Sequence, residues 1–384
     1  MADEKPEGAA CPLFGRCGGC TSQGIPYKDQ LLAKKRRLAV SARVKEENVL
    51  VFSGKEYGYR SRMDFIFCKG GLGLREKDNW KRAVPVKYCP IADEKTNQLL
   101  GEVRSFFKEA DVFDLVKKTG TFRYAVIRTS SKDSAVSLVI NSKSNVTHSA
   151  IEEVKRFCKE TSAEDIIVTY VPPETDMSVS SEYSVVKGKD CLEEEYLGKT
   201  FEYSVQGFFQ NNHEMAREMQ KYVQSLLKKS LEAGKGQGNT HLLDLYGGVG
   251  TFGIINFDLF SRVTIVESFK ECIDSAKKNI EKNKSSNVET ILLDAQKIKE
   301  LSLPDEEELY VVTDPPRSGM HPDTIRDLNN RKPRVIIYIS CNIRQLSKEL
   351  PLFQGYETRS VAMFDLFPQT QHYEGVVELV RKQV

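Results

Sequence analysis

The sequence predicts an α/β fold with a doubly wound, largely parallel sheet in its C-terminal half. Two observations indicate this fold. Apolar strand signals alternate with helical segments from residue 241 onward, and the first strand runs directly into the glycine turn of "LLDLYGGVGTFG" (residues 242–253). Strands that are separated by helices cross over and run parallel. The predicted strands are His241–Leu245, Arg262–Glu267, Glu289–Leu293, Leu309–Thr313 and Val335–Ser340, and the clearest helix between them is Phe269–Lys284.

Length and composition limit the class of protein. The chain has 384 residues, with 40% hydrophobic and 29% charged residues, which suits two or three folded domains with buried cores. No apolar run reaches the ~18 residues that a membrane-spanning helix needs, and the acidic start lacks the apolar stretch of a signal peptide. The nine cysteines are an odd number and do not fit a closed disulfide framework. We therefore expect a cytoplasmic, reducing compartment and no membrane partner.

Three segments differ in pattern and predict three domains. Residues 1–91 are rich in cysteine, glycine and charge, and contain a predicted helix over Tyr27–Val40. Residues 92–204 mix helices and strands and are expected to form a central α/β domain. Residues 205–384 contain the doubly wound sheet, and the polar stretch Glu232–Thr240 within them predicts a loop. The elements expected in the central domain are the helices Asn97–Lys108 and Ala150–Lys159 and the strands Tyr124–Thr129, Ala135–Ile140 and Asp165–Val171.

Basic and aromatic side chains are interleaved over residues 54–87. Nine Lys and Arg stand against four acids, although the net charge of the whole chain is only +2. The aromatic residues of this segment are Tyr57, Tyr59, Phe65, Phe67 and Trp80. Basic groups attract phosphates and aromatic rings stack on unpaired bases, so the mixture suits RNA or single strands. The alternative is a solvated, two-faced sheet whose aromatic side chains point inward.

Acidic residues follow the predicted strands of the C-terminal sheet at their carboxyl ends. Glu267 ends the second strand, Asp294 the third and Asp314 the fourth. An acid about twenty residues after the glycine turn can accept hydrogen bonds from ribose hydroxyls. So many anions disfavour a phosphate-bearing cofactor and favour a cationic one, and S-adenosylmethionine has both the hydroxyls and the cation. The alternative is a plain dinucleotide fold with capping aspartates, because Gly248-Val249-Gly250 matches only part of the dinucleotide fingerprint.

Asp314 lies in "TDPPRSG" (313–319), where two prolines form a stiff turn. Aspartate-proline-proline at this place is typical of methyltransferases that act on bases. Amino-methylating enzymes continue with an aromatic residue that stacks on the base. Here Arg317 follows instead, which argues against methylation of a nitrogen.

Cys341 follows the last predicted strand, within "SCNIRQL" (340–346), so it is expected at the same sheet edge as Asp314. A thiolate there could add to C6 of a pyrimidine, which makes C5 nucleophilic toward a methyl group. Arg317 and Arg344 are candidates for the cation that favours the thiolate. A base must then remove the C5 proton, and His372 and Glu374 both suit. The alternatives for Cys341 are a metal ligand or a buried structural cysteine.

Three cysteines fall within ten residues in "CPLFGRCGGC" (11–20). An even spread would place about 0.2 in such a window, so a metal site is expected. Cys11, Cys17 and Cys20 need a fourth ligand, for which Cys68 and Cys89 are candidates. The spacing C-x5-C-x2-C is not that of most zinc ribbons, which favours a [4Fe–4S] cluster.

Together these motifs resemble the RNA uracil-5-methyltransferase family. The matching stretches are "FFQNN" (208–212), "LLDLYGGVGTFG" (242–253), "TDPPRSG" (313–319), "SCNIRQL" (340–346) and "FPQTQHYE" (367–374). The resemblance implies a class I, Rossmann-like methyltransferase domain that uses S-adenosylmethionine. It makes Cys341 the nucleophile, Glu374 the general base and Asp314 the residue that positions the uracil, with His372 a neighbour. The cofactor contacts that it implies are Gln210, Tyr246, Glu267, Asp294 and Asp314.

The resemblance extends to the cysteines of the N-terminal region, where cluster-bearing members have C-x5-C-G-x-C. It makes Cys89, in "YCPI", the fourth ligand and leaves Cys68 to packing. Many such relatives carry a small RNA-binding β-barrel ahead of the cysteines, whereas only ten residues precede Cys11 here. RNA is then expected to bind the central domain and residues 54–87.

The predicted function is transfer of a methyl group to C5 of an extruded uridine in structured RNA. We expect tRNA as the first substrate and large-subunit rRNA as the second, and a monomeric enzyme. One alternative is an RNA cytosine-5-methyltransferase, which shares the covalent chemistry. Another is a non-catalytic iron–sulfur protein that binds RNA.

Overall fold

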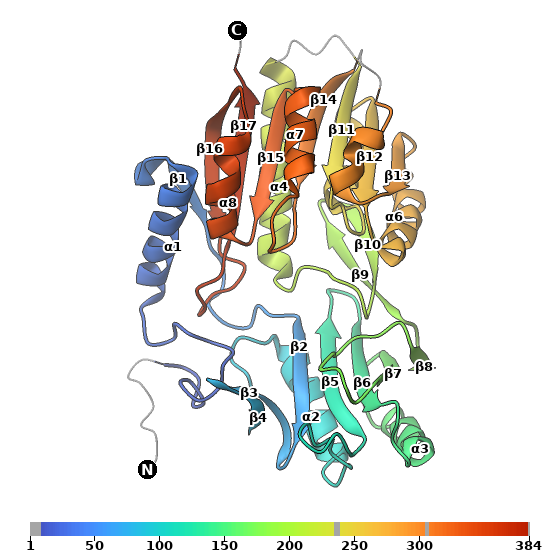
Figure 1. Cartoon of the computed structure of the whole chain (residues 1–384). Coiled ribbons are helices and arrows are strands. Elements are labelled where there is room, and N and C mark those ends of the chain that lie inside the picture. The colour runs from blue at the N-terminus through green and yellow to red at the C-terminus, as the bar shows by residue number, and fades with distance from the viewer. Residues whose placement is uncertain (1–8, 234–238, 304–306, 383–384) are drawn as a thin grey trace.

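Two β-sheets lie one above the other in the computed structural model, which describes residues 9–233, 239–303 and 307–382 (Figure 1). Part of the predicted loop Glu232–Thr240 lies outside these residues. Among the described residues, no helix is both long enough and apolar enough to span a membrane.

The eight-stranded sheet is formed by the C-terminal half of the chain and one strand from the N-terminal region. It is parallel except for β17, which runs antiparallel to both of its neighbours. In spatial order its strands are β1 (Val49–Phe52), β16 (Tyr356–Phe364), β17 (Glu374–Arg381), β15 (Val335–Ser340), β14 (Glu308–Thr313), β11 (Thr240–Leu245), β12 (Arg262–Glu267) and β13 (Val288–Leu292). All five predicted strands of this sheet are present, shifted by one residue at most.

Both faces of this sheet are covered, which explains why its central strands are continuous apolar runs. One face packs against α4 (His213–Ala233), α5 (Thr251–Asn256) and α6 (Lys270–Lys282). The other packs against α1 (Tyr27–Ala42), α7 (Pro322–Arg331) and α8 (Ile343–Glu349). Short 3-10 turns are η1 (Glu46–Asn48), η2 (Phe257–Leu259), η3 (Ala295–Glu300) and η4 (Leu350–Leu352).

The seven-stranded sheet is antiparallel except for the pair β6 and β7. Its strands in spatial order are β4 (Asn79–Pro85), β3 (Gly71–Glu76), β2 (Arg62–Cys68), β5 (Phe122–Thr129), β6 (Ser134–Asn141), β7 (Asp165–Val171) and β8 (Tyr183–Lys187). The helices α2 (Glu94–Phe106) and α3 (Thr147–Phe157) cover one face. A hairpin of β9 (Cys191–Tyr196) and β10 (Lys199–Ser204) lies apart from both sheets and contacts α6.

Strand β2 shows how the basic and aromatic segment folds. Phe65 and Phe67 point into the core under α2 and α3, as the two-faced sheet alternative predicts. Arg62 and Asp64, at the alternate positions, form an ion pair of 3.0 Å on the opposite face. Trp80 does not join the core and is exposed. The segment therefore combines both interpretations: most of its rings are buried, while its charges and one ring remain available.

Residues 1–91, which the sequence separates from the central segment, contribute to both sheets. Strand β1 pairs with β16 of the eight-stranded sheet, whereas β2, β3 and β4 belong to the same sheet as β5. The sheet thus crosses the boundary expected at residue 91. Local composition does not record which distant strand a segment will pair with, so it cannot place such a boundary.

Candidate active site

A cavity of about 960 Å³ opens where the parallel strands of the eight-stranded sheet end. Strands β11, β12, β14 and β15 run in one direction, so the residues after them meet at one edge. Every candidate catalytic and cofactor residue lines this cavity, namely Gln210, Tyr246, Glu267, Asp294, Asp314, Cys341 and Glu374.

The glycine turn after β11 forms one wall of the cavity. Tyr246 and Gly248 adopt left-handed backbone conformations, with φ of 58° and 56°. Gly247 lies so close to β12 that an added Cβ would approach Ile265 Cγ2 to 2.5 Å. The turn therefore depends on glycine for its close approach to the sheet. Asp244 supports it from below by accepting a hydrogen bond of 2.8 Å from the Gly253 N–H.

Glu267 has a fixed orientation at the end of β12. Its carboxylate accepts hydrogen bonds from the N–H groups of Gly248 (3.1 Å), Ser268 (2.7 Å) and Phe269 (3.0 Å). Asp294 follows β13 and is exposed, with Oδ1 accepting from the Gln296 N–H at 3.0 Å. These two acids form an anionic rim whose shape is set by backbone donors, and such a rim suits hydroxyl or amino groups of a ligand.

Strand register brings two further carboxyl groups and one thiol together. Ser340 in β15 pairs with Gly375 in β17, so Cys341 and Glu374 are neighbours across that pair. Strand β14 pairs with β15 on the other side, and Asp314 follows it directly. A nucleophile and two carboxyl groups therefore meet at one end of the cavity.

Burial changes the protonation of this group. It raises the pKa of Asp314 to about 7. The pKa of Glu374 lies well above its usual value because of burial and the nearby Asp314. Burial also raises the pKa of the Cys341 thiol to about 11, with Glu374 and Asp314 adding to the effect and Arg317 opposing it. Glu374 Oε2 has no hydrogen-bond partner among the described residues. A cationic ligand fits this end of the cavity, since it would favour the ionised forms of these groups and offset their charge.

The loop that carries Asp314 is tied to α8. Gly319 has φ of +81°, and a Cβ there would lie 2.0 Å from Glu349 Oε1. Glu349 accepts a hydrogen bond of 3.1 Å from the Met320 N–H. Asn342, directly after Cys341, donates to the Arg317 carbonyl at 2.7 Å. Sequence reasoning missed Glu349, because a glutamate at a helix end is usually exposed. The sequence signal for a paired Glu349 is Gln345, one helical turn earlier. In the structure the Gln345 amide donates to Glu349 at 2.7 Å.

The loop that leads to Glu374 is held by the N-terminal segment. Lys34 on α1 forms a buried ion pair of 2.7 Å with Asp365. The carbonyl of Gln369 accepts hydrogen bonds of 3.0 Å from the N–H groups of Thr21 and Ser22. Tyr59 donates to the Pro368 carbonyl at 2.9 Å. These contacts join residues more than 300 positions apart, and the sequence contains no sign of them.

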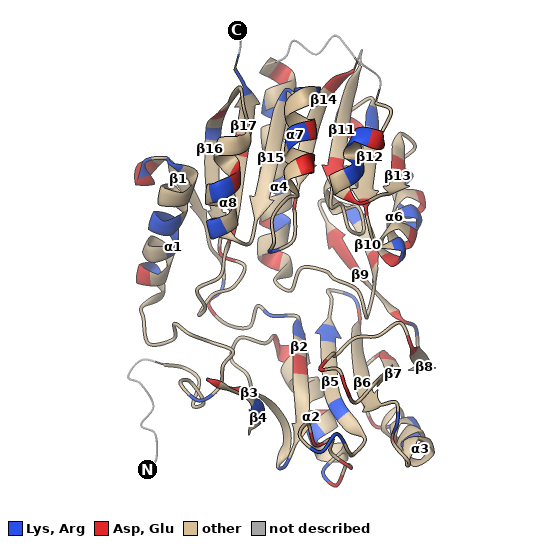
Figure 2. Cartoon of the chain, viewed as in Figure 1, with Lys and Arg blue, Asp and Glu red and all other residues tan. Residues whose placement is uncertain are grey.

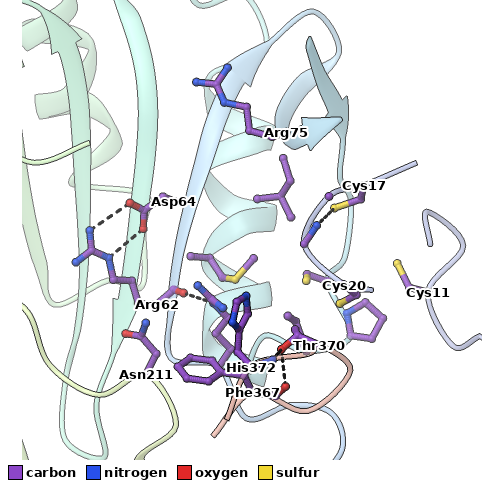
Figure 3. A pocket seen from close by; sticks show the side chains of 18 of the residues that line it. Cys11, Cys17, Cys20, Arg62, Asp64, Arg75, Asn211, Phe367, Thr370 and His372 are labelled. Carbon is purple, nitrogen blue, oxygen red and sulfur yellow. Dashed lines mark hydrogen bonds and ion pairs between the residues drawn. The ribbon is translucent and has the colours of Figure 1, made fainter. Parts of the chain in front are cut away.

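A second cavity, of about 720 Å³, lies between the two sheets and adjoins the first. Both cavities are lined by Phe208, Phe209, Arg317, Phe367 and His372. Figure 3 shows Cys11, Cys17 and Cys20 on its N-terminal side, and Phe367, Thr370 and His372 on the side of the loop before β17.

All four candidate cluster ligands line this second cavity, namely Cys11, Cys17, Cys20 and Cys89. Burial raises the pKa of Cys20 to about 12, and the other three thiols add to the effect. The N–H groups of Leu13 and Gly19 lie 3.4 Å from the sulfurs of Cys11 and Cys17. Four thiols with backbone donors to sulfur have the donor chemistry of an iron–sulfur site. Within the described ranges, however, no three or more His, Cys, Asp or Glu side chains are close enough to hold a metal ion.

The model of the tRNA (uracil-5-)-methyltransferase family matches residues 26–382, nearly the whole chain. The chain belongs to this family. The match confirms the resemblance found in the sequence motifs. As a member, the protein is an S-adenosylmethionine-dependent RNA uracil-5-methyltransferase. This assignment disfavours the plain dinucleotide fold, the cytosine enzyme and the non-catalytic RNA-binding protein that the sequence left open.

Individual relatives match this chain over almost its full length. A protein of Caldanaerobacter subterraneus subsp. tengcongensis, described as an uncharacterized RNA methyltransferase, is 33% identical over 390 residues, covering 97% of this chain and 84% of that protein. A tRNA (uracil(54)-C(5))-methyltransferase of Pyrococcus horikoshii is 30% identical over 375 residues, covering 97% and 86%. The structure of a tRNA (uracil-54, C5)-methyltransferase of Pyrococcus abyssi with S-adenosyl-L-homocysteine has a TM-score of 0.78 at 27% identity, covering 95% and 86%.

Proposed function

We propose that this protein methylates C5 of a uridine in tRNA, with S-adenosylmethionine as the methyl donor. The observation that carries the proposal is the single cavity in which Cys341, Asp314 and Glu374 meet at one end and Glu267 lies at the carboxyl end of β12. The names of the Pyrococcus relatives favour tRNA over large-subunit rRNA. An enclosed thiol can reach C6 only if the uridine leaves its stack, so the substrate base must be extruded.

The chemistry proceeds in three steps. The Cys341 thiolate forms a bond to C6, and the electron pair of the C5–C6 double bond makes C5 enolate-like. C5 then bonds to the methyl carbon of S-adenosylmethionine, which leaves as S-adenosylhomocysteine. Glu374 finally takes the proton from C5, the C5–C6 double bond forms again, and the C6–S bond breaks to return the thiolate.

The electrostatics of the cavity couple these steps to ligand binding. The raised pKa of Cys341 keeps its thiol protonated at neutral pH in the free protein. A bound sulfonium cation would favour the thiolate and also the charged forms of Asp314 and Glu374. Thiolate formation would therefore follow methyl-donor binding, which limits reaction of the thiol with other electrophiles.

The remaining candidate residues hold the methyl donor. Glu267, fixed by three backbone N–H groups, binds the ribose hydroxyls. Asp294 would lie at the adenine, and Gln210 and Tyr246, which line the same cavity, would also contact the donor. Asp314 lies between the donor and the uracil and positions the base.

Cys11, Cys17, Cys20 and Cys89 are proposed to hold a [4Fe–4S] cluster. Because methyl transfer is redox-neutral, the proposed role of the cluster is structural: it orders the loop that supports Gln369 and the segment before Glu374. Protein purified without oxygen is expected to contain about four iron and four sulfide per chain. Cys89→Ser should lose them, whereas Cys158→Ser, outside the cavity, should retain them. A metal-free wild-type protein with full activity would contradict the cluster.

We further propose that residues 1–91 and 92–204 together contact the RNA, with residues 205–384 as the catalytic domain. The protein is proposed to act as a monomer in the cytoplasm.

The reaction is tested directly by incubating the protein with methyl-labelled S-adenosylmethionine and an unmodified tRNA transcript. Digestion to nucleosides should place the label in 5-methyluridine, with a large-subunit rRNA transcript labelled more slowly or not at all. A transcript in which cytidine replaces the target uridine is the matched control. Label in 5-methylcytidine, or in no nucleoside of either RNA, would refute the proposal.

A further inference from the structure

The chain's single tryptophan lies exposed on an edge strand. Trp80 has an exposed fraction of 59% and sits in β4, the first strand of the seven-stranded sheet. Its neighbours Lys81 and Arg82 are exposed as well, so three consecutive residues of a strand face solvent. Tryptophan usually buries most of its large ring, and an exposed one indicates a surface that meets a partner.

The surroundings of this ring are basic. Between residues 75 and 87 there are five Lys and Arg against two acids. The Lys81 ammonium lies 5.7 Å from the centre of the Trp80 ring. In Figure 2 the blue of basic residues is visible on the ribbon of β4. An aromatic ring can stack on a base of RNA while neighbouring cations contact the adjacent phosphates.

Hydrogen bonds fix the hairpin of β3 and β4 at the far side of the second cavity. Arg75, which lines that cavity, donates to the Trp80 carbonyl at 2.6 Å and pairs with Asp176 at 2.7 Å. The loop of residues 11–20, which carries three of the candidate cluster cysteines, also holds the hairpin. The Gly18 N–H donates to the Arg75 carbonyl at 2.9 Å, and the Lys77 N–H donates to the Arg16 carbonyl at 2.7 Å. The ring therefore has a set position and is not carried on a loose loop.

The second cavity connects this hairpin with the catalytic end of the first. Arg317 and His372 line both cavities, and Arg75 lies on the wall that the second cavity shares with the hairpin. Arg60 and Arg62 also line it. The hairpin that carries Trp80 therefore borders a cavity that adjoins the catalytic one and is lined with cations.

We propose that Trp80 stacks on an unpaired base of the RNA substrate outside the catalytic cavity, with Lys81 and Arg82 contacting the flanking phosphates. This inference rests on the proposed function in so far as RNA is the substrate. A protein strand that pairs with the free edge of β4 is the weaker alternative, because lysine on an edge strand disfavours such pairing. Stacking tolerates any base, so Trp80 contributes to the affinity for RNA and to its orientation. Specificity for uridine is determined in the catalytic cavity.

The single tryptophan allows a direct test with the full-length wild-type protein. An unmodified tRNA transcript is titrated into the protein while the emission of Trp80 is recorded. We expect saturable quenching with the same dissociation constant as filter binding. S-adenosylhomocysteine alone should leave the emission unchanged. Unchanged emission at saturating RNA would overturn the inference, as would RNA-independent quenching caused by self-association.

Variants separate stacking from charge and from folding. Trp80→Ala is expected to weaken RNA binding by about 5- to 100-fold and raise KM by a similar factor, with kcat at saturating RNA within about 2-fold. Trp80→Phe, which retains a ring, should restore most of the affinity. Lys81→Ala should reduce the slope of log binding constant against log salt concentration by about one, the change expected for the loss of one phosphate contact. Equal thermal midpoints and S-adenosylhomocysteine affinities show that the variants are folded.

The outcomes for the two proposals differ. If RNA quenches the Trp80 emission and Trp80→Ala binds RNA more weakly, but no 5-methyluridine forms, the stacking site is supported and the proposed reaction is refuted. Formation of 5-methyluridine with wild-type RNA affinity in Trp80→Ala would refute the stacking site alone.

Discussion

Replacing Cys341 by serine is expected to lower the rate of methyl transfer by at least about 10³-fold, because a serine hydroxyl does not supply the anion that must add to C6. Glu267, Gly248 and the rest of the methyl-donor end of the cavity are untouched by this change. Binding of S-adenosylhomocysteine, measured by calorimetry, should therefore remain within about 3-fold of the wild type. The rate is measured in single turnover with excess protein, so that product release does not obscure the chemical step.

The chain offers a matched control for this variant. Cys191, at the start of β9, also has a pKa raised to about 11 by burial, but it lines neither cavity. Cys191→Ser should retain the wild-type rate within about 2-fold. If Cys341→Ser kept the wild-type rate while binding RNA normally, the covalent mechanism would have to be abandoned.

Glu374→Gln is expected to arrest the reaction after methyl transfer. Glutamine cannot take the C5 proton, so the C6–S bond persists and turnover falls by about 10²- to 10⁴-fold. The arrested species is RNA joined to protein, and it should survive denaturing electrophoresis as a band that carries the methyl label. Adding Cys341→Ser to the variant should abolish that band, which would identify the sulfur that is joined to RNA.

Glu378 provides the control for Glu374. It lies on the same strand, is equally buried and has a pKa raised by burial, but it accepts a hydrogen bond from Ser230 on α4. Glu378→Gln should form product without a persistent adduct. A Glu374→Gln protein that turns over like the wild type would assign the base to another group, with His372 the nearest candidate in the sequence.

Local patterns were sufficient to place the candidate site residues at one edge of the eight-stranded sheet. An acid or thiol directly after an apolar strand reaches the carboxyl edge of a parallel sheet wherever the strand lies in it. Asp314, Cys341 and Glu267 could therefore be assigned to one cavity from their positions alone, and the cavity contains them. The predicted strands of the eight-stranded sheet agree with the structure for the same reason, since apolar runs of this length are recorded locally.

Long-range pairing could not be predicted. Nothing within residues 49–52 indicates that this strand joins β16, and nothing near Gln369 indicates that the backbone of Thr21 and Ser22 will bind it. The aromatic residues near the N-terminus show the same limit. Phe65 and Trp80 lie in the same basic and aromatic segment, but the first is in the core and the second is exposed, because β2 lies inside the sheet beneath α2 whereas β4 is its edge strand.

The packing of α1 and β1 against the sheet that contains β16 and β17 also sets the order in which the two sheets can fold. Strands β2 to β8 lie within a continuous stretch of 126 residues, from Arg62 to Lys187, so the seven-stranded sheet can assemble while the ribosome is still working. The eight-stranded sheet needs β17, which is translated after all of its other strands, and the partner of Lys34 is Asp365. The nascent chain therefore carries α1 without its docking surface until β16 and β17 have been made.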